Sequence, residues 1–239
     1  ALARPSGQGH ETAFPALVAN ILGLPEDRID LRYNDVAMPK LAGTGSFGSR
    51  SLISHGSALA NGAKEIVRKA KELAAKELEV APQDLTFEDG RYRVPGTDLS
   101  IDMQSIIMNN LGEVEHPLDT SVGFDTATSF PSGAHVAEVE IDPETGALEI
   151  VNYVAVDDAG VIYNHVLVEG QLQGGLMQGI GQVVGEHIVY DPANGQLLSG
   201  TFMDYFMPRA QLFPPLVLKD RGVDRKSTRL NSSHANISY

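Results

Sequence analysis

The stretch HVAEVEIDPETGALEIVNYVAV, residues 135–156, decides the fold class. Apolar and polar residues alternate along both of its arms, and Pro143-Glu-Thr-Gly146 separates the arms with turn-forming residues. The pattern predicts two strands, His135–Asp142 and Leu148–Val156, that pair with each other. Strands joined this way are antiparallel, so the chain does not follow the strand-helix-strand alternation of a parallel sheet.

Three helices are expected around these strands. Residues His10–Leu22 place apolar side chains three, four and seven positions apart, and Gly23 follows where a left-handed C-cap belongs. A long helix is predicted from about Ser49 to Leu78, with small residues in its first half and charges in its second. A third is predicted from about His165 to Ile188. Its interior glycines each cost up to about 1 kcal/mol relative to Ala, so packing or a ligand is expected to compensate.

Two shorter elements complete the predicted fold. Ile29–Tyr33 alternates apolar and polar residues, which predicts a half-buried strand. Phe87–Tyr92 contains Asp89-Gly90, a dipeptide typical of a two-residue hairpin turn. Because helices are interleaved with hairpin-joined strands, the sequence predicts an α+β fold.

Composition limits the function classes. The 239 residues are 42% hydrophobic and 21% charged, with a formal net charge of -13 and no cluster of basic residues in the body of the chain. No apolar run approaches the roughly 18 residues of a membrane helix, and phosphate-backbone binding would need a basic patch. The chain has no Cys, so it can form no disulfide, thiolate metal site or iron-sulfur cluster of its own.

The two ends of the sequence differ from its body. The chain begins with Ala rather than Met, and we expect a domain spanning residues 1–223 that is incomplete at both ends. Residues 224–239, DRKSTRLNSSHANISY, are polar and show no apolar period. They read either as a flexible tail or, because they resemble a translated sequencing adapter, as a non-native addition. On the second interpretation, the N-x-S sequons at Asn231 and Asn236 have no biological meaning.

Glycine-rich segments are the strongest functional signal in the residues themselves. Gly7–Thr12 and Gly43–Ser51 both precede predicted helices, and a third segment, Gly170–Gln182, lies within one. Free N–H groups and the positive end of the helix dipole favour anions, and Gly lets a phosphate approach the backbone. Arg50 adds a planar donor suited to phosphate. We therefore expect an organic ligand that bears phosphate, although either loop alone could be a tight turn.

Two other interpretations of the loop stay open at this point. Gly43, Gly45 and Gly48 satisfy G-x-G-x-x-G, which would suit an NAD(P)-linked dehydrogenase, but residues 38–41 do not resemble the buried strand that such a unit requires. A non-catalytic ligand-binding module is the other alternative. The sequence contains no motif of serine hydrolases, zinc peptidases or P-loop enzymes.

Other polar residues receive no catalytic role. Asp157 and Asp158 precede Ala159-Gly160 and are more typical of a turn than of an acid-base pair. Glu11 lies in a predicted first helical turn, where the helix dipole alone favours a carboxylate, and the histidines, His10 included, show no metal-ligand spacing.

Six blocks together resemble one known family. In order and spacing, they are similar to the second molybdopterin-binding domain of the large subunit of the xanthine dehydrogenase, aldehyde oxidase and aerobic carbon monoxide dehydrogenase family. The resemblance extends from Gly7 to about Arg209. One departure is Tyr163-Asn164-His165, where the family usually has Ile-Asn-Pro; an N1 helix position tolerates His. The blocks are GQGHET, GTGSFGSRS, HVAEVEIDPETG, VAVDDAG, VEGQLQGGLMQGIGQ and YDPANGQLLSGTFMDYFMPRA.

The resemblance implies a bacterial molybdenum hydroxylase. Such an enzyme hydroxylates an aldehyde or N-heterocycle, or oxidises carbon monoxide, with molybdenum held by molybdopterin. Iron-sulfur clusters and FAD are expected in partner subunits of a cytoplasmic hetero-oligomer, and the GSRS-type loop is most similar to members that carry the cytosine dinucleotide form.

The resemblance also assigns residues to the cofactor. It implies that Gln8 and Gly9 contact the cofactor phosphate and that Gln178 contacts the pterin. By the same resemblance, the nucleotide end or pyrophosphate is contacted by Gly48, Ser49, Arg50 and Ser51. The family's catalytic glutamate is expected downstream of Arg209. This fragment is therefore expected to contain no catalytic residue or metal ligand and to be inactive alone.

Overall fold

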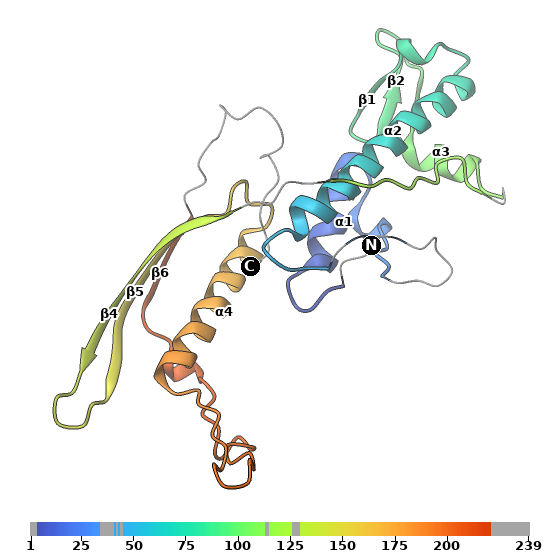
Figure 1. Cartoon of the computed structure of the whole chain (residues 1–239). Helices are drawn as coiled ribbons and strands as arrows, with labels where there is room; N and C mark the ends of the chain where they lie inside the picture. The colour runs from blue at the N-terminus through green and yellow to red at the C-terminus, as the bar shows by residue number, and fades with distance from the viewer. Residues whose placement is uncertain are drawn as a thin grey trace. The chain divides into compact units, whose positions relative to one another are not determined.

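The computed structural model describes residues 4–33, 41, 43, 45–112, 115–125 and 130–220. The chain divides into two compact units, Ala1–Ser129 and Phe130–Tyr239, and each has a sheet of its own (Figure 1). Hairpin-joined strands accompany helices in both units, which confirms the α+β prediction. The predicted tail, residues 224–239, lies outside the described part of the chain.

Two of the predicted helices lie in the first unit. Helix α1 occupies His10–Leu22, as predicted, and Gly23 caps it in the left-handed conformation. The long helix is also confirmed, but it begins as a π-helical segment, η2 (Ser51–Gly56), which continues into α2 (Ser57–Glu77). Of the small residues in its first half, Ser51, Gly56 and Ser57 are buried, whereas Ser54, Ala58 and Gly62 are partly exposed.

Helix α1 runs parallel to η2 and α2. A Cβ added at Gly56 would lie 3.6 Å from Cδ2 of Leu17, and five residues further along α1 Leu22 shares a buried cluster with Ala63. Contacts therefore advance in the same direction on both helices, as the ribbon also shows (Figure 1). The amino-terminal ends of α1 and η2 consequently lie at the same end of the unit.

The opposite end of this helix pair carries the hydrophobic core. Strands β1 (Thr86–Glu88), β2 (Arg91–Arg93) and β3 (Ser100–Asp102) form an antiparallel sheet in sequence order, followed by α3 (Met103–Asn109). The core lies between this sheet, α3 and the second half of α2. Tyr92 is fully buried there, and its hydroxyl donates to the carbonyl of Val67 at 2.6 Å. The buried cluster consists of Leu22, Ala63, Ala70, Ala74, Ala75, Leu85, Tyr92, Met103, Ile106 and Leu118.

The end of α1 crosses the first hairpin at two glycines. Asp89 and Gly90 have φ of 46° and 73°, which confirms the predicted two-residue turn. A Cβ on Gly23 would lie 2.0 Å from the backbone nitrogen of Gly90. Only two residues without side chains can cross at this distance, so Gly23 both ends α1 and allows the hairpin to pack against it.

The predicted strand at Ile29–Tyr33 is wrong. The described chain there is irregular and follows a short 3-10 helix, η1 (Glu26–Arg28), although Ile29 does pack against the core. Alternating apolar and polar residues indicate that one face of a segment is buried, but a strand also needs a partner for its backbone N–H and C=O groups. The sheet of this unit is built from β1, β2 and β3 instead, and the short 3-10 helix η3 (Pro82–Asp84) precedes it.

The second unit is an open sheet beside one helix. Strands β4 (Ser132–Ile141) and β5 (Leu148–Asp158) form the predicted hairpin, with an irregularity at Glu138/Val139, and β6 (Leu216–Asp220) pairs with β5 in parallel. Helix α4 (His165–Val184) confirms the third predicted helix, with His165 at its first position and the Asn164 side chain capping Leu167 N–H. A single bridge pairs Tyr190 with Leu197, and the 3-10 helix η4 (Ala210–Leu212) precedes β6. Among the described helices, none is long and apolar enough to cross a membrane.

Candidate anion-binding site

The loop before η2 has an unusual backbone. Gly48 and Ser49 both have positive φ, 62° and 53°, and Arg50 follows with φ -112° and ψ 0°. Ser49 is one of the few non-glycine residues in this left-handed region, which costs free energy for a residue with a Cβ. A left-handed residue followed by one of negative φ turns successive N–H groups to one side, an arrangement that binds anions. The N-cap residue of η2, Arg50, makes no side-chain cap hydrogen bond to the helix.

Arg50 presents a donor edge that the described chain does not satisfy. Its Nε and Nη2 atoms are buried and have no hydrogen-bond partner among the described residues. Its guanidinium carbon lies 3.8 Å from the ring centroid of Phe47, so the aromatic ring stacks on the cation. Nε–H and Nη2–H form the parallel pair of donors that matches two oxygens of a carboxylate or phosphate. The loop therefore holds a bidentate anion donor in a fixed orientation.

Three hydroxyl groups are buried and unpaired among the described residues, as the Arg50 nitrogens are. Tyr33 Oη, Ser46 Oγ and Ser57 Oγ are buried and have no hydrogen-bond partner among the described residues. Burial, with a smaller contribution from the charge of Glu11, raises the pKa of Tyr33 to about 12, so its hydroxyl stays a donor at neutral pH. The dependence on Glu11 places Tyr33 near the first turn of α1. Sequence reasoning did not single out Tyr33 or Ser57 as site residues, because neither lies in a motif.

The segment before α1 is organised by Gln8. Its Oε1 accepts from the backbone N–H of Ser6, and its Nε2 donates to the carbonyl of Arg4 at 3.3 Å. Gly9 caps α1 in the left-handed conformation, with φ 77°. The Gln8 amide therefore folds the loop that leads into α1 by bonding back to Ser6 and Arg4.

The parallel arrangement brings together two of the three groups of predicted site residues. Gln8 and Gly9 precede α1, Gly48–Ser51 lead into η2, and both helices begin at the same end of the first unit. Gln178 lies in α4 of the second unit, exposed beside Gly174, Gly175 and Gly179. A Cβ on any of these three glycines would meet nothing within 4 Å, so packing within the unit does not explain them.

Asp157 and Asp158 behave differently from each other. Asp158 accepts from the N–H of Gly160 at 3.0 Å, which confirms the predicted turn chemistry. Asp157 is buried, and its carboxylate pairs with Nε2 of His135 on β4 at 3.1 Å. For Asp157, the turn interpretation was therefore wrong, because the strand register places it over Gly133 and beside His135. Within the described residues, no cluster of His, Asp or Glu could hold a metal ion.

The two helix starts follow glycines, and the buried Arg50 edge and hydroxyl donors lack acceptors among the described residues; this arrangement would suit an anionic organic ligand. The chain belongs to the molybdopterin cofactor-binding domain family, whose model matches residues 3–214. The resemblance identified in the sequence is thereby confirmed.

The chain is similar to large subunits of a carbon monoxide dehydrogenase and a nicotine 6-hydroxylase. The carbon monoxide dehydrogenase large chain of Hydrogenophaga pseudoflava is 35% identical over 211 residues, which are 85% of this chain and 26% of that one. The nicotine 6-hydroxylase large subunit of Paenarthrobacter nicotinovorans is 32% identical over 89% of this chain and 27% of its own length. The carbon monoxide dehydrogenase structure from Oligotropha carboxidovorans superposes with a TM-score of 0.79 at 30% identity, covering 99% of this chain and 29% of that one. The chain thus spans about a quarter of the length of the curated relatives it matches.

Proposed function

We propose that this chain is part of the large subunit of a molybdenum hydroxylase and that it binds molybdopterin in the cytosine dinucleotide form. The observation that carries the proposal is the buried Nε/Nη2 edge of Arg50, which has no acceptor among the described residues and lies at an uncapped helical start. A pyrophosphate supplies the missing acceptor oxygens and the negative charge that this helix end favours. The family match favours this cofactor over the NAD(P)-linked alternative.

Different site residues contact different parts of the cofactor. Gly48, Ser49, Arg50 and Ser51 contact the nucleotide end or pyrophosphate, Gln8 and Gly9 contact the cofactor phosphate, and Gln178 contacts the pterin. The backbone of the first two groups suits this role, because the ends of α1 and η2 face the same side of one unit. Tyr33, Ser46 and Ser57 add hydroxyl donors near these ends. When bound, the molybdenum centre supplies the redox chemistry, and this chain's residues hold and orient it.

The reaction and the partners follow from the relatives' classes. We propose oxidative hydroxylation of an aldehyde or an N-heterocycle, or oxidation of carbon monoxide; one relative is named a nicotine 6-hydroxylase and another a carbon monoxide dehydrogenase. Electrons then pass to iron-sulfur and FAD subunits in a cytoplasmic hetero-oligomer. The catalytic glutamate lies in the part of the large subunit outside this chain. The cofactor-binding part of this sequence is residues 1–223, consistent with a family match that ends at residue 214.

The deciding experiment measures the cofactor directly. The full-length large subunit is purified with its partner subunits, molybdenum is quantified per polypeptide, and nucleotides released by acid are separated by chromatography. We expect about one molybdenum and one CMP per large subunit. GMP or AMP in place of CMP would refute the cytosine form alone. Stoichiometric NAD(P) without molybdenum would refute the proposed cofactor class.

A further inference from the structure

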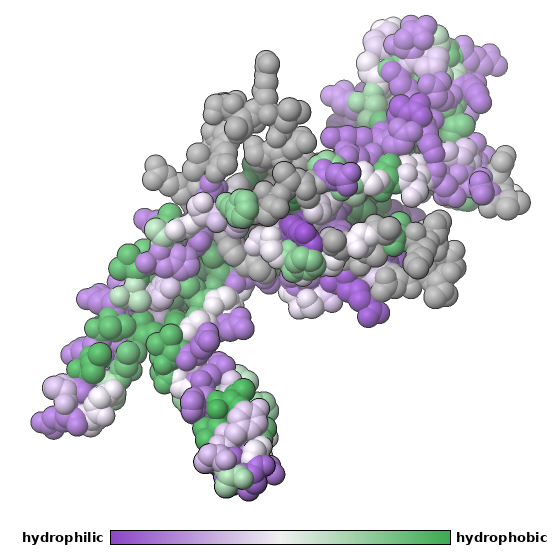
Figure 2. All heavy atoms as spheres, viewed as in Figure 1, coloured by the Kyte–Doolittle hydropathy of each residue, from purple (hydrophilic) through white to green (hydrophobic). Residues whose placement is uncertain are grey.

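The second unit contains a deep open groove between its sheet and α4. Its volume is about 510 Å³. One wall is formed by β4 and β5, including Ala137, Val139 and Leu148, and the other by the side of α4 that carries Gly175, Gly179 and Val183. In the space-filling view, hydrophobic residues gather along the hairpin and along α4 (Figure 2).

Both walls leave large apolar side chains in water. Val139 on the sheet is 48% exposed, Leu148 is 38% exposed and Val183 on the helix is 79% exposed. Contiguous exposed apolar surface of this kind is unfavourable in a soluble domain and marks a surface that another protein segment covers. The apolar residues occupy facing sides of one groove, so a single segment lying along it can cover both.

The glycines of α4 leave the helical side of the groove without side chains at those positions. A Cβ at Gly175 or Gly179 would meet nothing within 4 Å, so neither glycine is required by contacts within the unit. Interior glycines destabilise a helix, and their usual compensation is the close approach of another backbone. The missing side chains thus make room for a polypeptide segment.

One corner of the groove is polar and offers only acceptors. His135 Nε2 lies 3.1 Å from Asp157 Oδ2, and Nδ1 lies 3.2 Å from the hydroxyl of Tyr153. With the Nε2–H donated to Asp157, Nδ1 accepts the Tyr153 proton, and both ring nitrogens are used. The remaining capacity is on the carboxylate and the tyrosine oxygen, which can only accept. A segment that fits this corner must therefore bring a hydrogen-bond donor.

The charge of the unit favours a cationic donor. Between Phe130 and Asp220, only Arg209 and Lys219 are basic, whereas the hairpin alone carries Glu138, Glu140 and Glu149. Two copies of such a unit would repel each other. A Lys or Arg on the covering segment would meet attraction from the whole surface and an acceptor in the polar corner.

We infer that this groove is covered by a segment of the same large-subunit polypeptide that lies outside residues 1–223, apolar along the groove and carrying a Lys or Arg toward Asp157. The inference rests on the proposed function, since it requires the chain to be part of a longer subunit. Its relatives allow for such a segment: the chain covers 26% of one large chain and 29% of a solved one.

Cysteine labelling tests the inference, because the chain has no native Cys. Val139→Cys and Val183→Cys report on the two walls of the groove, and Glu144→Cys, in the exposed turn between β4 and β5, is the matched control. Maleimide labelling at each site is read by peptide mass spectrometry, in this 239-residue chain and in the full-length subunit. We expect both wall cysteines to be protected at least tenfold in the full-length subunit and the control to change less than threefold. Equal labelling of the wall cysteines in both proteins would overturn the inference.

A photocrosslinker attached to Val139→Cys then identifies the occupant. We expect a crosslinked peptide of the same polypeptide, from outside residues 1–223, that contains apolar residues and a Lys or Arg. A peptide from residues 1–129, from a second copy or from another subunit would refute the inference. Molybdenum content is measured in the same preparation: an exposed groove in a molybdenum-loaded subunit contradicts only the inference, whereas a subunit without molybdenum contradicts the proposed function.

Discussion

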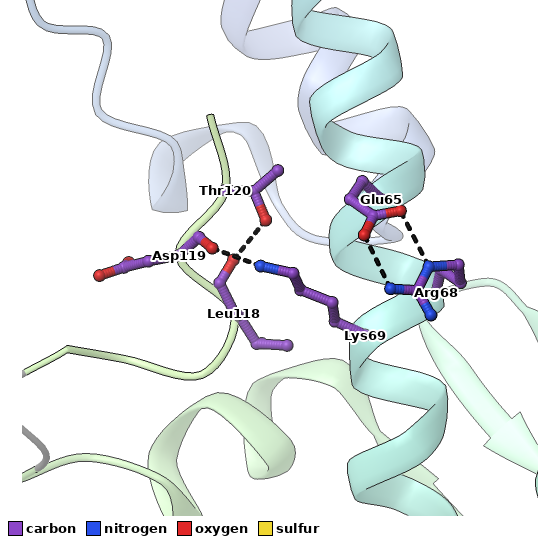
Figure 3. Close-up of polar contacts among 6 residues, drawn as sticks. All are labelled: Glu65, Arg68, Lys69, Leu118, Asp119 and Thr120. Carbon is purple, nitrogen blue, oxygen red and sulfur yellow. Dashed lines mark hydrogen bonds and ion pairs between the residues drawn. The ribbon is translucent and has the colours of Figure 1, made fainter. Parts of the chain in front are cut away.

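The start of η2 and the charged half of α2 each contain an arginine, and the two arginines use the same donor edge differently. Arg68 donates from Nε and Nη2 to the two carboxylate oxygens of Glu65, at 2.9 and 2.8 Å, on an exposed surface (Figure 3). Its neighbour Lys69 donates to the carbonyl of Asp119. Arg50 buries the same two nitrogens without an acceptor among the described residues. The Arg68 donor edge is satisfied within the helix, whereas the Arg50 donor edge has no acceptor among the described residues.

The difference has an energetic basis. A buried donor without an acceptor costs about 1 to 3 kcal/mol, more when it is charged, while an exposed ion pair contributes less than about 1 kcal/mol. A chain that keeps several such donors together at one helical start loses stability in its free form. A bound anion recovers that loss, so the unsatisfied end of the helix is the informative one.

The largest expected effect is a loss of stability, and it compares the core at the end of α2 with the beginning of that helix. Met103 is fully buried in the core, and Met103→Ala should lower the free energy of unfolding by about 3 kcal/mol through lost burial and a residual cavity. Ser57 is also buried, but its hydroxyl has no partner among the described residues, so Ser57→Ala should change stability by less than about 0.5 kcal/mol or raise it. Urea unfolding of the 239-residue chain measures both. A loss at Ser57→Ala as large as that at Met103→Ala would show that this hydroxyl is satisfied within the chain.

The second prediction compares the two arginines directly. In the full-length subunit, Arg50→Glu replaces a bidentate donor with a like charge beside the pyrophosphate, and should lower cofactor occupancy at least roughly tenfold, or about 1.4 kcal/mol. Arg68→Glu removes an exposed ion pair and should leave occupancy unchanged. Molybdenum and CMP per polypeptide are measured beside thermal unfolding. Full occupancy in Arg50→Glu would mean that the loop is only a turn.

A third prediction concerns α3, a helix whose first turn is capped by a side chain of the same chain. Asp102 caps α3 by accepting from Ser105 N–H at 2.7 Å, whereas η2 has no side-chain cap. Asp102→Ala should cost about 1 kcal/mol at neutral pH. The Ser105 hydrogen bonds, with a smaller contribution from the charge of Arg91, hold the pKa of Asp102 below its ordinary value.

The cap therefore depends on pH in one direction. A carboxyl whose pKa is lowered by folding adds stability above its unfolded pKa, and this stability is lost as the pH falls through the folded value. Unfolding of wild type and Asp102→Ala should differ at pH 7, and the difference should shrink as the pH falls below about 4, the ordinary pKa of an Asp side chain. Asp98→Ala, in the exposed loop before β3, is the control. A difference between wild type and Asp102→Ala that persists unchanged at low pH would contradict the cap.

The sequence predicted those elements whose signal is local. The bounds of α1, the Asp89-Gly90 turn and the hairpin of β4 and β5 follow from periodicity and turn chemistry, and the structure has all three. Ile29–Tyr33 was wrong because a pairing partner is not encoded in five residues. Glycine and arginine motifs predict the two groups of proposed site residues in the first unit, but their position at a common end depends on the parallel packing of α1 on α2.

The sequence did not reveal the roles of some residues because those roles depend on tertiary structure. Tyr33 and Ser57 lie in no motif; they differ from ordinary polar residues in that their hydroxyls are buried without a partner in the described part of the chain. Asp157 was taken for a turn residue because its neighbours are turn formers. Its pairing with His135 depends on the register between β4 and β5, which the irregularity at Glu138/Val139 shifts. A pattern of single residues does not fix such a register.

The smallest expected effect is at Arg68, and it completes the comparison. Glu65 and Arg68 form an exposed pair three residues apart on α2, and the Arg68 hydrogen bond holds the pKa of Glu65 below its ordinary value. Because water and salt screen such a pair, Arg68→Ala should shift the unfolding midpoint of the 239-residue chain by less than about 2 °C, and the shift should shrink further in 1 M NaCl. Lys64→Ala, on the same exposed face of the helix, is the control for the removal of one positive charge. The midpoint is measured by circular dichroism at low and high salt for all three proteins. A shift several times larger than that of Lys64→Ala, and insensitive to salt, would mean that the satisfied arginine stabilises the free chain strongly. The contrast with Arg50 would then reflect burial of the two side chains rather than the absence of an acceptor.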